Sequence, residues 1–402
     1  VKLPFFCAMR VPLLDLSDEY RALAEPLQRE IAGVLASQRF ILGPKVQLFE
    51  DALATYCGSA NAVGMSSGTD ALLALLMCFG IGPGDAVITT AYTFFATAGC
   101  ISRLGAKPIF IDIDPATFNI SPAAIERYLS EHCERRDAGI VDQTGATIRA
   151  IMPVHLFGLC CDMQPILDVA QQYNLHVLED AAQAIGAEYS MNNGTARAGT
   201  MGDAGFFSFY PSKNLGAAGD AGAAVCREAE LAKKLRICRQ HGMEERYFHN
   251  SIGGNFRLDE IQAAILAVKL PFLEQWSAAR RGVADRYRDG FSRIDLTSRI
   301  TLPAEPYSAC GLTNHHIYHQ YVIRTEERDA LREHLLGKEI ATAIYYPLGL
   351  HQQNCFAFLD YREGALPETE RAARESLALP IFPTLTQEAQ NYVVKSIAEF
   401  FA

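Results

Sequence analysis

The sequence predicts an α/β protein, in which a large domain with a mostly parallel sheet is followed by a smaller C-terminal α+β domain. Between about residues 61 and 225, apolar runs of strand length alternate with helical patterns, an order typical of parallel sheets. The expected strands are 86–89, 108–113, 150–154, 176–179, 204–209 and 221–225. The expected helices between them are 69–79, 95–104, 121–130 and 164–173.

The pattern changes after Gly254. A helical pattern covers residues 258–291 and is interrupted by Pro271, which lacks a backbone donor and therefore breaks or kinks a helix. A turn-rich stretch then precedes four further elements, namely strand 319–324, helix 327–336, strand 342–345 and helix 387–400. With a first helix expected within residues 13–36, we expect a large domain over residues 1–255 and a small domain over 256–402.

Composition narrows the class of protein. The 402 residues are 49% apolar, enough for two hydrophobic cores. A formal net charge of -10 argues against nucleic acid as the main partner, because binding phosphates needs a basic surface. The longest uncharged apolar run, residues 71–82, is too short to span a membrane, so no membrane partner is expected.

The cysteines indicate a reducing environment. All eleven lie in segments without the spacing of zinc ligands, so we expect no metal site and a cytoplasmic protein with reduced core cysteines. Near the N-terminus we expect Met9 to be the natural start and residues 1–8 to be an upstream extension.

One lysine stands out. An aromatic run that is typical of a buried strand ends at Pro211, and Lys213 follows, before a loop of glycines and alanines. Burial disfavours the charged ammonium and lowers the pKa of an amine. A neutral amine is a nucleophile that forms Schiff bases with carbonyl compounds, including pyridoxal phosphate (PLP).

Two polar segments could complete a site around this lysine. Residues 65–70 precede an apolar helix, and a helix N-terminus binds anions such as phosphate; simple capping by Ser67 or Thr69 is the alternative. Asp180 follows an apolar strand, where a carboxylate can pair with a protonated ring nitrogen; an N-cap for the next segment is the alternative.

Two further features are consistent with PLP. An aromatic residue within 90–97 could stack on a flat ring or belong to the core, and Ser208 could face a phosphate or be a satisfied buried hydroxyl. Together, the phosphate-binding helix, the aromatic cover, the acid and the lysine are the protein groups that PLP chemistry requires. The lysine could also carry the proton that leaves the substrate carbon.

These segments make the sequence resemble the DegT/DnrJ/EryC1/StrS sugar aminotransferases, which are PLP-dependent enzymes of fold type I. The matching segments are residues 11–16, 42–44, 66–72, 153–158, 179–183, 208–222, 253–264 and 379–383. The resemblance implies that a PLP-bound homodimer transfers the amino group of L-glutamate to a keto group of a nucleotide-linked sugar, in the synthesis of amino sugars for lipopolysaccharide or other cell-surface polysaccharide.

The resemblance also implies roles for individual residues. It implies that Lys213 forms the covalent bond with PLP, that Asp180 pairs with the ring nitrogen and that Gln183 lies near the ring hydroxyl. The remaining cofactor contacts that it implies are stacking by Phe94, phosphate binding by Gly68, Thr69 and Ser208, and a phosphate contact from the neighbouring subunit by Asn255. Since members that dehydrate sugars carry histidine in place of the lysine, Lys213 favours transamination.

The substrate is less sharply indicated. Arg239, His319 and Tyr345 are candidate contacts to the sugar or diphosphate; the alternative is that they are surface or domain-interface groups. Residues 249–257 resemble those of members that act on UDP-linked 2-acetamido-3-keto sugars. The alternatives are a 4-keto sugar linked to dTDP, UDP or GDP, another PLP enzyme such as a lyase or dehydratase, and a non-catalytic PLP-binding regulator.

Overall fold

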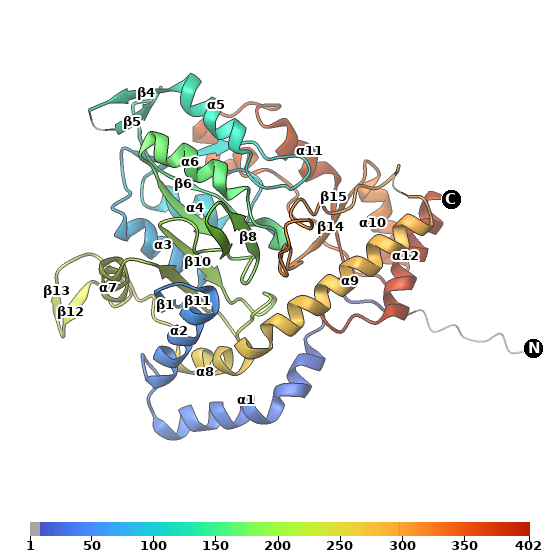
Figure 1. The fold of residues 1–402 in the computed structure, drawn as a ribbon, viewed down its shortest axis with the longest axis horizontal. Helices are drawn as coiled ribbons and strands as arrows, with labels where there is room; N and C mark the ends of the chain where they lie inside the picture. Colours follow the sequence, from blue (N-terminus) through green and yellow to red (C-terminus); the bar gives the residue numbers. More distant parts are fainter. Residues whose placement is uncertain (1–8, 138, 297) are drawn as a thin grey trace, which may run out of the picture.

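The structure is a computed structural model, and it describes residues 9–137, 139–296 and 298–402, so the expected extension at residues 1–8 lies outside the described residues. A large body built around a mixed sheet carries a smaller group of helices and strands at one end (Figure 1). Among the described helices, none is long and apolar enough to cross a lipid bilayer.

The large body is organised by a nine-stranded sheet whose central path has the order β1-β11-β10-β7-β6-β2-β3. The pairs β10–β7, β7–β6, β6–β2 and β2–β3 are parallel, and β11 runs against both of its neighbours. The strands are β1 (Asn61–Met65), β2 (Asp85–Thr90), β3 (Lys107–Ile111), β6 (Thr147–Met152), β7 (His176–Asp180), β10 (Ala204–Ser208) and β11 (Gly222–Cys226), with β4 (Cys133–Arg136) and β5 (Gly139–Asp142) attached beside β6. All six strands expected between residues 61 and 225 are confirmed, with ends shifted by a few residues.

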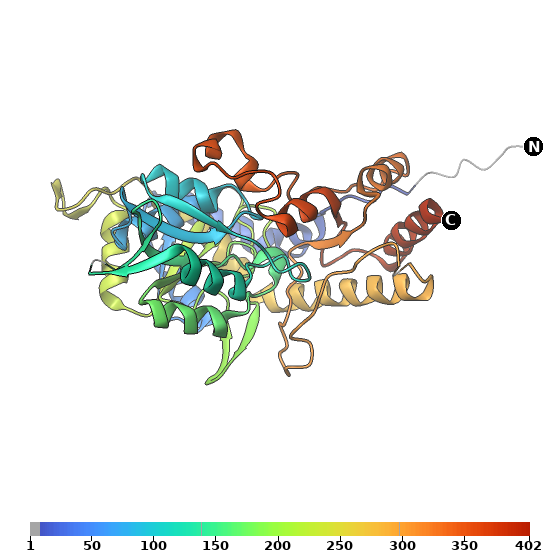
Figure 2. The ribbon, with the colours of Figure 1, turned by 90° about the horizontal axis from the view of Figure 1, so that it is seen from above.

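Helices cover both faces of this sheet (Figures 1 and 2). One face packs against α3 (Gly68–Cys78), α4 (Ala96–Arg103) and α7 (Ala229–Cys238); the other packs against α2 (Pro44–Cys57), α5 (Pro122–His132), α6 (Met163–Tyr173) and α8 (Glu260–Lys269). Neighbouring residues of one strand serve different cores, because Phe206 packs in the first and Phe207 in the second. This alternation explains why the strand sequences are apolar throughout.

The smaller group follows α9 (Leu273–Arg293), which continues from α8 through a short 3-10 turn containing Pro271 (Figure 1). The expected break at Pro271 is therefore confirmed. Its own core joins α9 to α10 (Arg328–Gly337), α12 (Gln387–Phe401) and the antiparallel pair β14 (Tyr321–Arg324) and β15 (Ser376–Leu379). The remaining helices are α1 (Ser17–Ser37), which packs on α8, and α11 (Pro367–Glu375).

One expected strand is wrong. Residues 342–345 form no strand, and only Ala343 makes an isolated bridge, to Ala378. The reason is that a side chain takes the backbone groups that a ladder would use. The Tyr92 hydroxyl donates to the carbonyl of Tyr345 at 2.6 Å and accepts from the Tyr346 N–H at 3.2 Å. The strand that pairs with β14 is β15 instead.

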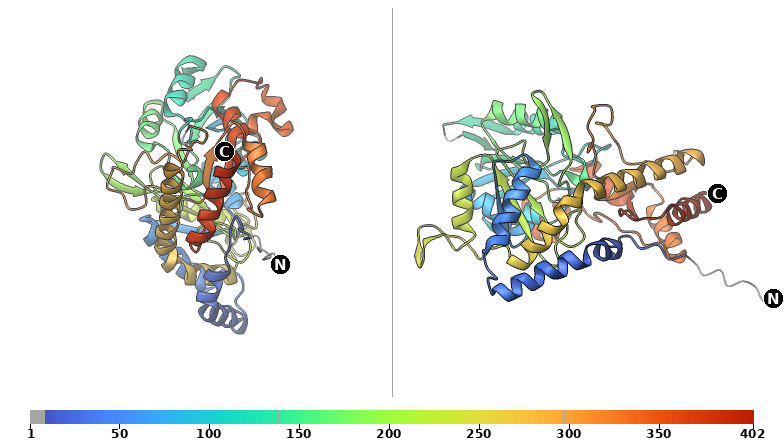
Figure 3. Two further views of the ribbon diagram at one scale, coloured as in Figure 1. Left: turned by 90° about the vertical axis from the view of Figure 1, so that its right-hand side faces the viewer. Right: turned by 60° about the horizontal axis from the view of Figure 1, so that its bottom comes forward.

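The two-domain division stays a prediction, and the cores suggest a different boundary. Leu258, Leu266 and Leu273 pack in the core of the large body, whereas Val11 packs with the small one. A small hairpin, β12 (Met243–Glu245) and β13 (Phe248–His249), projects from the large body (Figures 2 and 3). A second hairpin, β8 (Glu188–Met191) and β9 (Gly194–Arg197), lies beside α6.

Candidate active site

A cavity of about 810 Å³ opens where the carboxyl ends of the parallel strands meet. In such sheets this edge is where ligands bind, because the loops that leave the strands converge there. The segments that follow β1, β2, β6, β7 and β10 all contribute to its lining. The structure thereby brings together these residues predicted from the sequence: Gly68, Thr69, Phe94, Asp180, Gln183, Ser208, Lys213, His319 and Tyr345.

Lys213 lies in a turn after β10, fixed by a hydrogen bond from its N–H to the Tyr210 carbonyl at 2.8 Å. Burial lowers the pKa of its amine to about 8, although the nearby Asp180 carboxylate opposes this shift. The next residue, Asn214, is buried, and its side-chain nitrogen donates to the Ile317 carbonyl at 3.1 Å, which ties the turn to a segment about a hundred residues later. The lowered pKa agrees with the direction that the sequence predicts for a buried lysine at this position.

Asp180 ends β7 and faces the cavity. Its Oδ2 accepts a hydrogen bond from the Thr97 hydroxyl at 2.8 Å, and its Oδ1 accepts from the Ala182 N–H at 3.1 Å. Burial raises the pKa of this carboxyl group, and the two donors oppose the rise by favouring the charged form. A buried carboxylate with these donors still has capacity to accept a hydrogen bond from a cationic ring nitrogen.

The first turn of α3 forms a cradle beside Ser208. The side chain of Ser67 caps the helix by accepting from the Asp70 N–H at 3.0 Å, as the sequence suggested. Gly68 approaches β10 so closely that a Cβ on it would lie 2.7 Å from the Cβ of Ser208. The absence of a side chain at Gly68 thus leaves the helix N-terminus and the Ser208 hydroxyl open to a shared anion.

Gln183 and Phe94 complete the surroundings of a flat ring. The side-chain oxygen of Gln183 accepts from the Phe157 N–H at 2.9 Å, so its nitrogen is turned toward the Tyr346 hydroxyl, 3.0 Å away. Phe94 lines the cavity and is 58% exposed, which leaves an aromatic surface free to stack. Phosphate cradle, aromatic surface, acid and amine meet at one cavity, so the residues present fit PLP.

Two predicted residues lie elsewhere. Arg239 does not line the cavity; it is buried, and its guanidinium pairs with Glu50 and donates to the Gly64 carbonyl at 2.9 Å. Arg239 thus does not reach this cavity and already has a carboxylate partner, so its expected contact to the sugar or diphosphate stays a prediction. Asn255 is exposed near the base of the projecting hairpin, where it bridges to Gln240, and its action in a neighbouring subunit stays a prediction.

The structure also adds residues that sequence reasoning did not single out. Thr97 donates to Asp180 and belongs to the segment 90–97, but no local sequence pattern indicates that its hydroxyl contacts this carboxylate. Tyr346, which holds Gln183, adjoins the predicted Tyr345, and only tertiary contacts distinguish the two tyrosines. Asp220 also lines the cavity and is its second carboxylate, in addition to Asp180.

Comparison with known proteins places the chain in a family. The model of the DegT/DnrJ/EryC1/StrS aminotransferase family matches residues 22–398. The chain is 47% identical to the pleiotropic regulatory protein of Geobacillus stearothermophilus, over 98% of this chain and 99% of the relative. It is 41% identical to the UDP-N-acetyl-3-dehydro-α-D-glucosamine 3-aminotransferase of Acidithiobacillus ferrooxidans, over 94% of each chain. It is 37% identical to the dTDP-3-amino-3,4,6-trideoxy-α-D-glucose transaminase of Streptomyces venezuelae, over 97% of this chain and 96% of the relative.

Solved structures agree with this placement. DesV of S. venezuelae matches with a TM-score of 0.87 and 37% identity, over 97% of this chain and 98% of DesV. NtdA of Bacillus subtilis with bound cofactor PMP, the amino form of PLP, matches with a TM-score of 0.84 and 32% identity, over 97% of this chain and 85% of NtdA. The expected family, fold type I, enzyme class and cofactor are confirmed. The chain belongs to the DegT/DnrJ/EryC1/StrS aminotransferase family and is an aminotransferase that uses PLP.

Proposed function

We propose that the protein transfers the amino group of L-glutamate to the keto group of a nucleotide-linked sugar, with a UDP-linked 2-acetamido-3-keto sugar as its preferred acceptor. The observation that carries the proposal is the meeting of Lys213 and Asp180 at one cavity, beside the anion cradle of Gly68 and Ser208. When bound there, PLP supplies an electron-accepting ring for the substrate carbon that loses its proton.

The chain's own groups divide the remaining work. Asp180 holds the positive charge of the ring nitrogen, Gln183 orients the ring hydroxyl, and Phe94 covers the ring face. Lys213 binds the cofactor at rest and, once released, moves a proton at the substrate carbon, a role for which a pKa of about 8 suits neutral pH. The same residues serve both half-reactions, since glutamate and the sugar bind in turn.

His319 and Tyr345 are proposed to contact the sugar. The Nδ1 atom of His319 lies 3.0 Å from the side-chain oxygen of Asn214, whose nitrogen donates to the Ile317 carbonyl. Nδ1 therefore carries the proton, and Nε2 is left as an acceptor. Burial, reinforced by Lys213, lowers the pKa of His319 well below its usual value, so it offers a sugar hydroxyl a neutral acceptor.

We also propose that the working enzyme is a homodimer with shared sites. Among the described residues that line the cavity, Lys213 is the one lysine or arginine, while Asp180 and Asp220 are acidic. A cofactor phosphate and a nucleotide diphosphate together need more donors than this lining offers. In the proposed dimer, the projecting hairpin region of a second copy supplies a donor through Asn255. Its exposed Tyr247, Phe248 and Ile252 offer a surface that can pack against the partner.

The names of two relatives support an acceptor with its keto group at C3. The A. ferrooxidans relative is named for a 3-dehydro sugar linked to UDP, and the S. venezuelae relative for a 3-amino sugar linked to dTDP. The first is the more similar to this chain, at 41% against 37% identity, and it supports UDP over dTDP.

The proposal is tested by a screen in the reverse direction. UDP-, dTDP- and GDP-linked sugars that carry an amine at C3 or C4 are each offered with 2-oxoglutarate, and the formation of L-glutamate is measured. We expect the UDP-linked 2-acetamido-3-amino sugar to react fastest. Faster turnover of a 4-amino sugar, or of a dTDP- or GDP-linked sugar, would contradict the proposed acceptor.

A second candidate, a regulator that binds PLP without catalysis, is favoured by the 47% identical relative that is named a pleiotropic regulatory protein. The two functions differ in their response to glutamate. A transaminase loses the visible absorbance of its lysine-bound cofactor when glutamate converts it to the amino form. A visible band that persists in excess L-glutamate would favour the regulator.

A further inference from the structure

A histidine–glutamate pair lies buried directly behind the cavity. His155 and Glu179 are both 0% exposed, and His155 Nε2 lies 2.8 Å from a carboxylate oxygen of Glu179. Neither residue lines the cavity, and no role proposed above uses either of them. Burying an ionisable pair is costly unless all its hydrogen bonds are made, so the pair invites a functional explanation.

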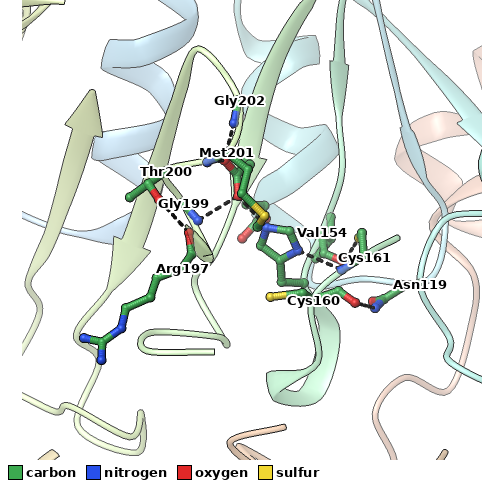
Figure 4. Close-up of polar contacts among 12 residues, drawn as sticks. Asn119, Val154, Cys160, Cys161, Arg197, Gly199, Thr200, Met201 and Gly202 are labelled. Atoms are coloured by element: carbon green, nitrogen blue, oxygen red, sulfur yellow. Dashed lines mark hydrogen bonds and ion pairs between the residues drawn. The ribbon is translucent and has the colours of Figure 1, made fainter. Parts of the chain in front are cut away.

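Backbone groups from separate segments satisfy this pair (Figure 4). The carboxylate of Glu179 accepts from the N–H groups of Gly199, Met201 and Gly202 at 2.6–2.7 Å. His155 Nδ1 accepts from the Cys161 N–H at 3.0 Å. Because Nδ1 is an acceptor, the proton of a neutral ring sits on Nε2 and is donated to Glu179.

Both residues of the pair are connected to Asp180, Glu179 as its neighbour in the chain and His155 by a backbone hydrogen bond. Glu179 precedes it on β7, so the two side chains point to opposite faces of the strand. The His155 N–H donates to the Asp180 carbonyl at 3.0 Å, and the Asp180 N–H donates to the Pro153 carbonyl at 2.9 Å. His155 therefore makes two hydrogen bonds to β7: its backbone N–H donates to the Asp180 carbonyl, and its ring donates to the Glu179 carboxylate.

We propose that His155 and Glu179 are positioning residues that hold the carboxylate of Asp180 where it can pair with the ring nitrogen of the cofactor. The inference rests on the role proposed above for Asp180. Loss of the ring contact leaves the segment after β6 joined to β7 by backbone hydrogen bonds alone, and it leaves the buried carboxylate of Glu179 with one donor fewer. The strand end that carries Asp180 then loses a constraint, and a charged hydrogen bond depends on close alignment.

Two substitutions of His155 separate its two ring contacts. In His155→Gln the amide nitrogen can replace Nε2 as the donor to Glu179, whereas in His155→Asn the amide oxygen can replace Nδ1 as the acceptor from Cys161. A matched control is His176→Asn, the same change on β7, the strand that carries Glu179; the His176 ring is half-exposed and lies 3.5 Å from Asp203. Glu179→Asp, which withdraws the carboxylate by one carbon, provides a second variant if His155→Asn fails to fold.

The readout is a ratio of affinities rather than activity. Each purified apoprotein is titrated with PLP and with its analogue in which the ring nitrogen is replaced by C–H, and the change in visible absorbance gives both dissociation constants. General loosening of the fold weakens both ligands together, whereas displacement of Asp180 weakens PLP selectively. The ratio of the two dissociation constants therefore measures how strongly the substituted residue is coupled to the ring nitrogen, as in a double-mutant cycle.

We expect His155→Asn and Glu179→Asp to reduce the preference for PLP over the analogue by about tenfold. His155→Gln and His176→Asn should keep the preference of the unmodified protein. An unchanged ratio in both His155→Asn and Glu179→Asp, with Asp180→Ala losing the preference, would overturn the positioning role while leaving the role of Asp180 intact. A preference that survives Asp180→Ala would overturn both.

Discussion

Gln183 donates a hydrogen bond from its side-chain nitrogen to the Tyr346 hydroxyl at 3.0 Å. This contact joins the segment after β7 to a segment 163 residues later in the chain, beyond α10. Because the oxygen of Gln183 is already occupied by the Phe157 N–H, the orientation of its amide is fixed from both ends. Tyr346 therefore sets the direction in which Gln183 presents its nitrogen to the ring hydroxyl.

We expect Tyr346→Phe to reduce kcat by about threefold to tenfold, because one hydrogen bond of typical strength no longer fixes the amide. The measurement is steady-state kinetics with L-glutamate and the amino-sugar pair found in the screen. Tyr361→Phe is the matched control, since within the described part of the chain its hydroxyl bonds to the backbone of Phe110 alone, outside the cavity. Equal losses of kcat in the two variants would count against the role of Tyr346.

The hydroxyl of Thr97 should control the charge of Asp180. A hydrogen bond to the charged form lowers the pKa of a carboxyl group, so removing the donor in Thr97→Val raises the pKa of Asp180 beyond the rise that burial already causes. We expect PLP affinity to fall off at a higher pH on the acid side in Thr97→Val, and Thr97→Ser to behave as the unmodified protein. Superimposable pH profiles of the two variants would refute this prediction.

The rate at which the apoprotein captures PLP should rise as Lys213 loses its proton. The neutral amine is the nucleophile, and its pKa is lowered to about 8, so the neutral fraction rises as the pH increases through that value. We expect the rate at which apoprotein and PLP develop visible absorbance to rise with pH and to level off above about 8. Lys213→Ala should bind PLP without this absorbance and show no turnover. A rate that keeps rising toward the ordinary lysine pKa would indicate an unperturbed amine.

The cradle at the start of α3 should tolerate no side chain. A Cβ at position 68 would lie 2.7 Å from the Cβ of Ser208, so Gly68→Ala must displace the helix start or β10 and distort the anion site. We expect PLP affinity to fall by at least about tenfold in Gly68→Ala. Gly33→Ala is the control, because among the described residues outside its own helical turn no atom lies within 4 Å of a Cβ placed there, and alanine favours a helix. Tight PLP binding by Gly68→Ala would rule out the cradle.

The buried pair of Arg239 and Glu50 should matter for stability. Arg239→Met leaves the Glu50 carboxylate buried without its cation, and breaking such a pair typically costs about 3–5 kcal/mol. Denaturant unfolding of the apoprotein measures this free energy. Arg299→Met, which breaks an exposed pair with Glu327, should cost less than about 1 kcal/mol. A small effect of Arg239→Met would argue that the pair is dispensable to the fold.

Much of the site could be predicted from the sequence, because its residues follow strands that local patterns reveal. Lys213, Asp180 and Ser208 each stand at the end of an apolar run, and parallel strands bring such ends to one edge. Arg239 shows the limit of this reasoning, since nothing near it in the sequence announces Glu50, 189 residues away. A charged residue beside a family motif has the same local pattern whether it meets a substrate or a buried carboxylate.

The sequence by itself determined the alternation of strands and helices, the break at Pro271 and the polar residues at the strand ends. Only the tertiary structure decided that β15 rather than residues 342–345 pairs with β14, and that Tyr346 orients Gln183. The physical reason is that periodicity and backbone preferences act between near neighbours in the chain. The partner of a strand, a hydroxyl or a buried charge is chosen instead by how distant segments pack.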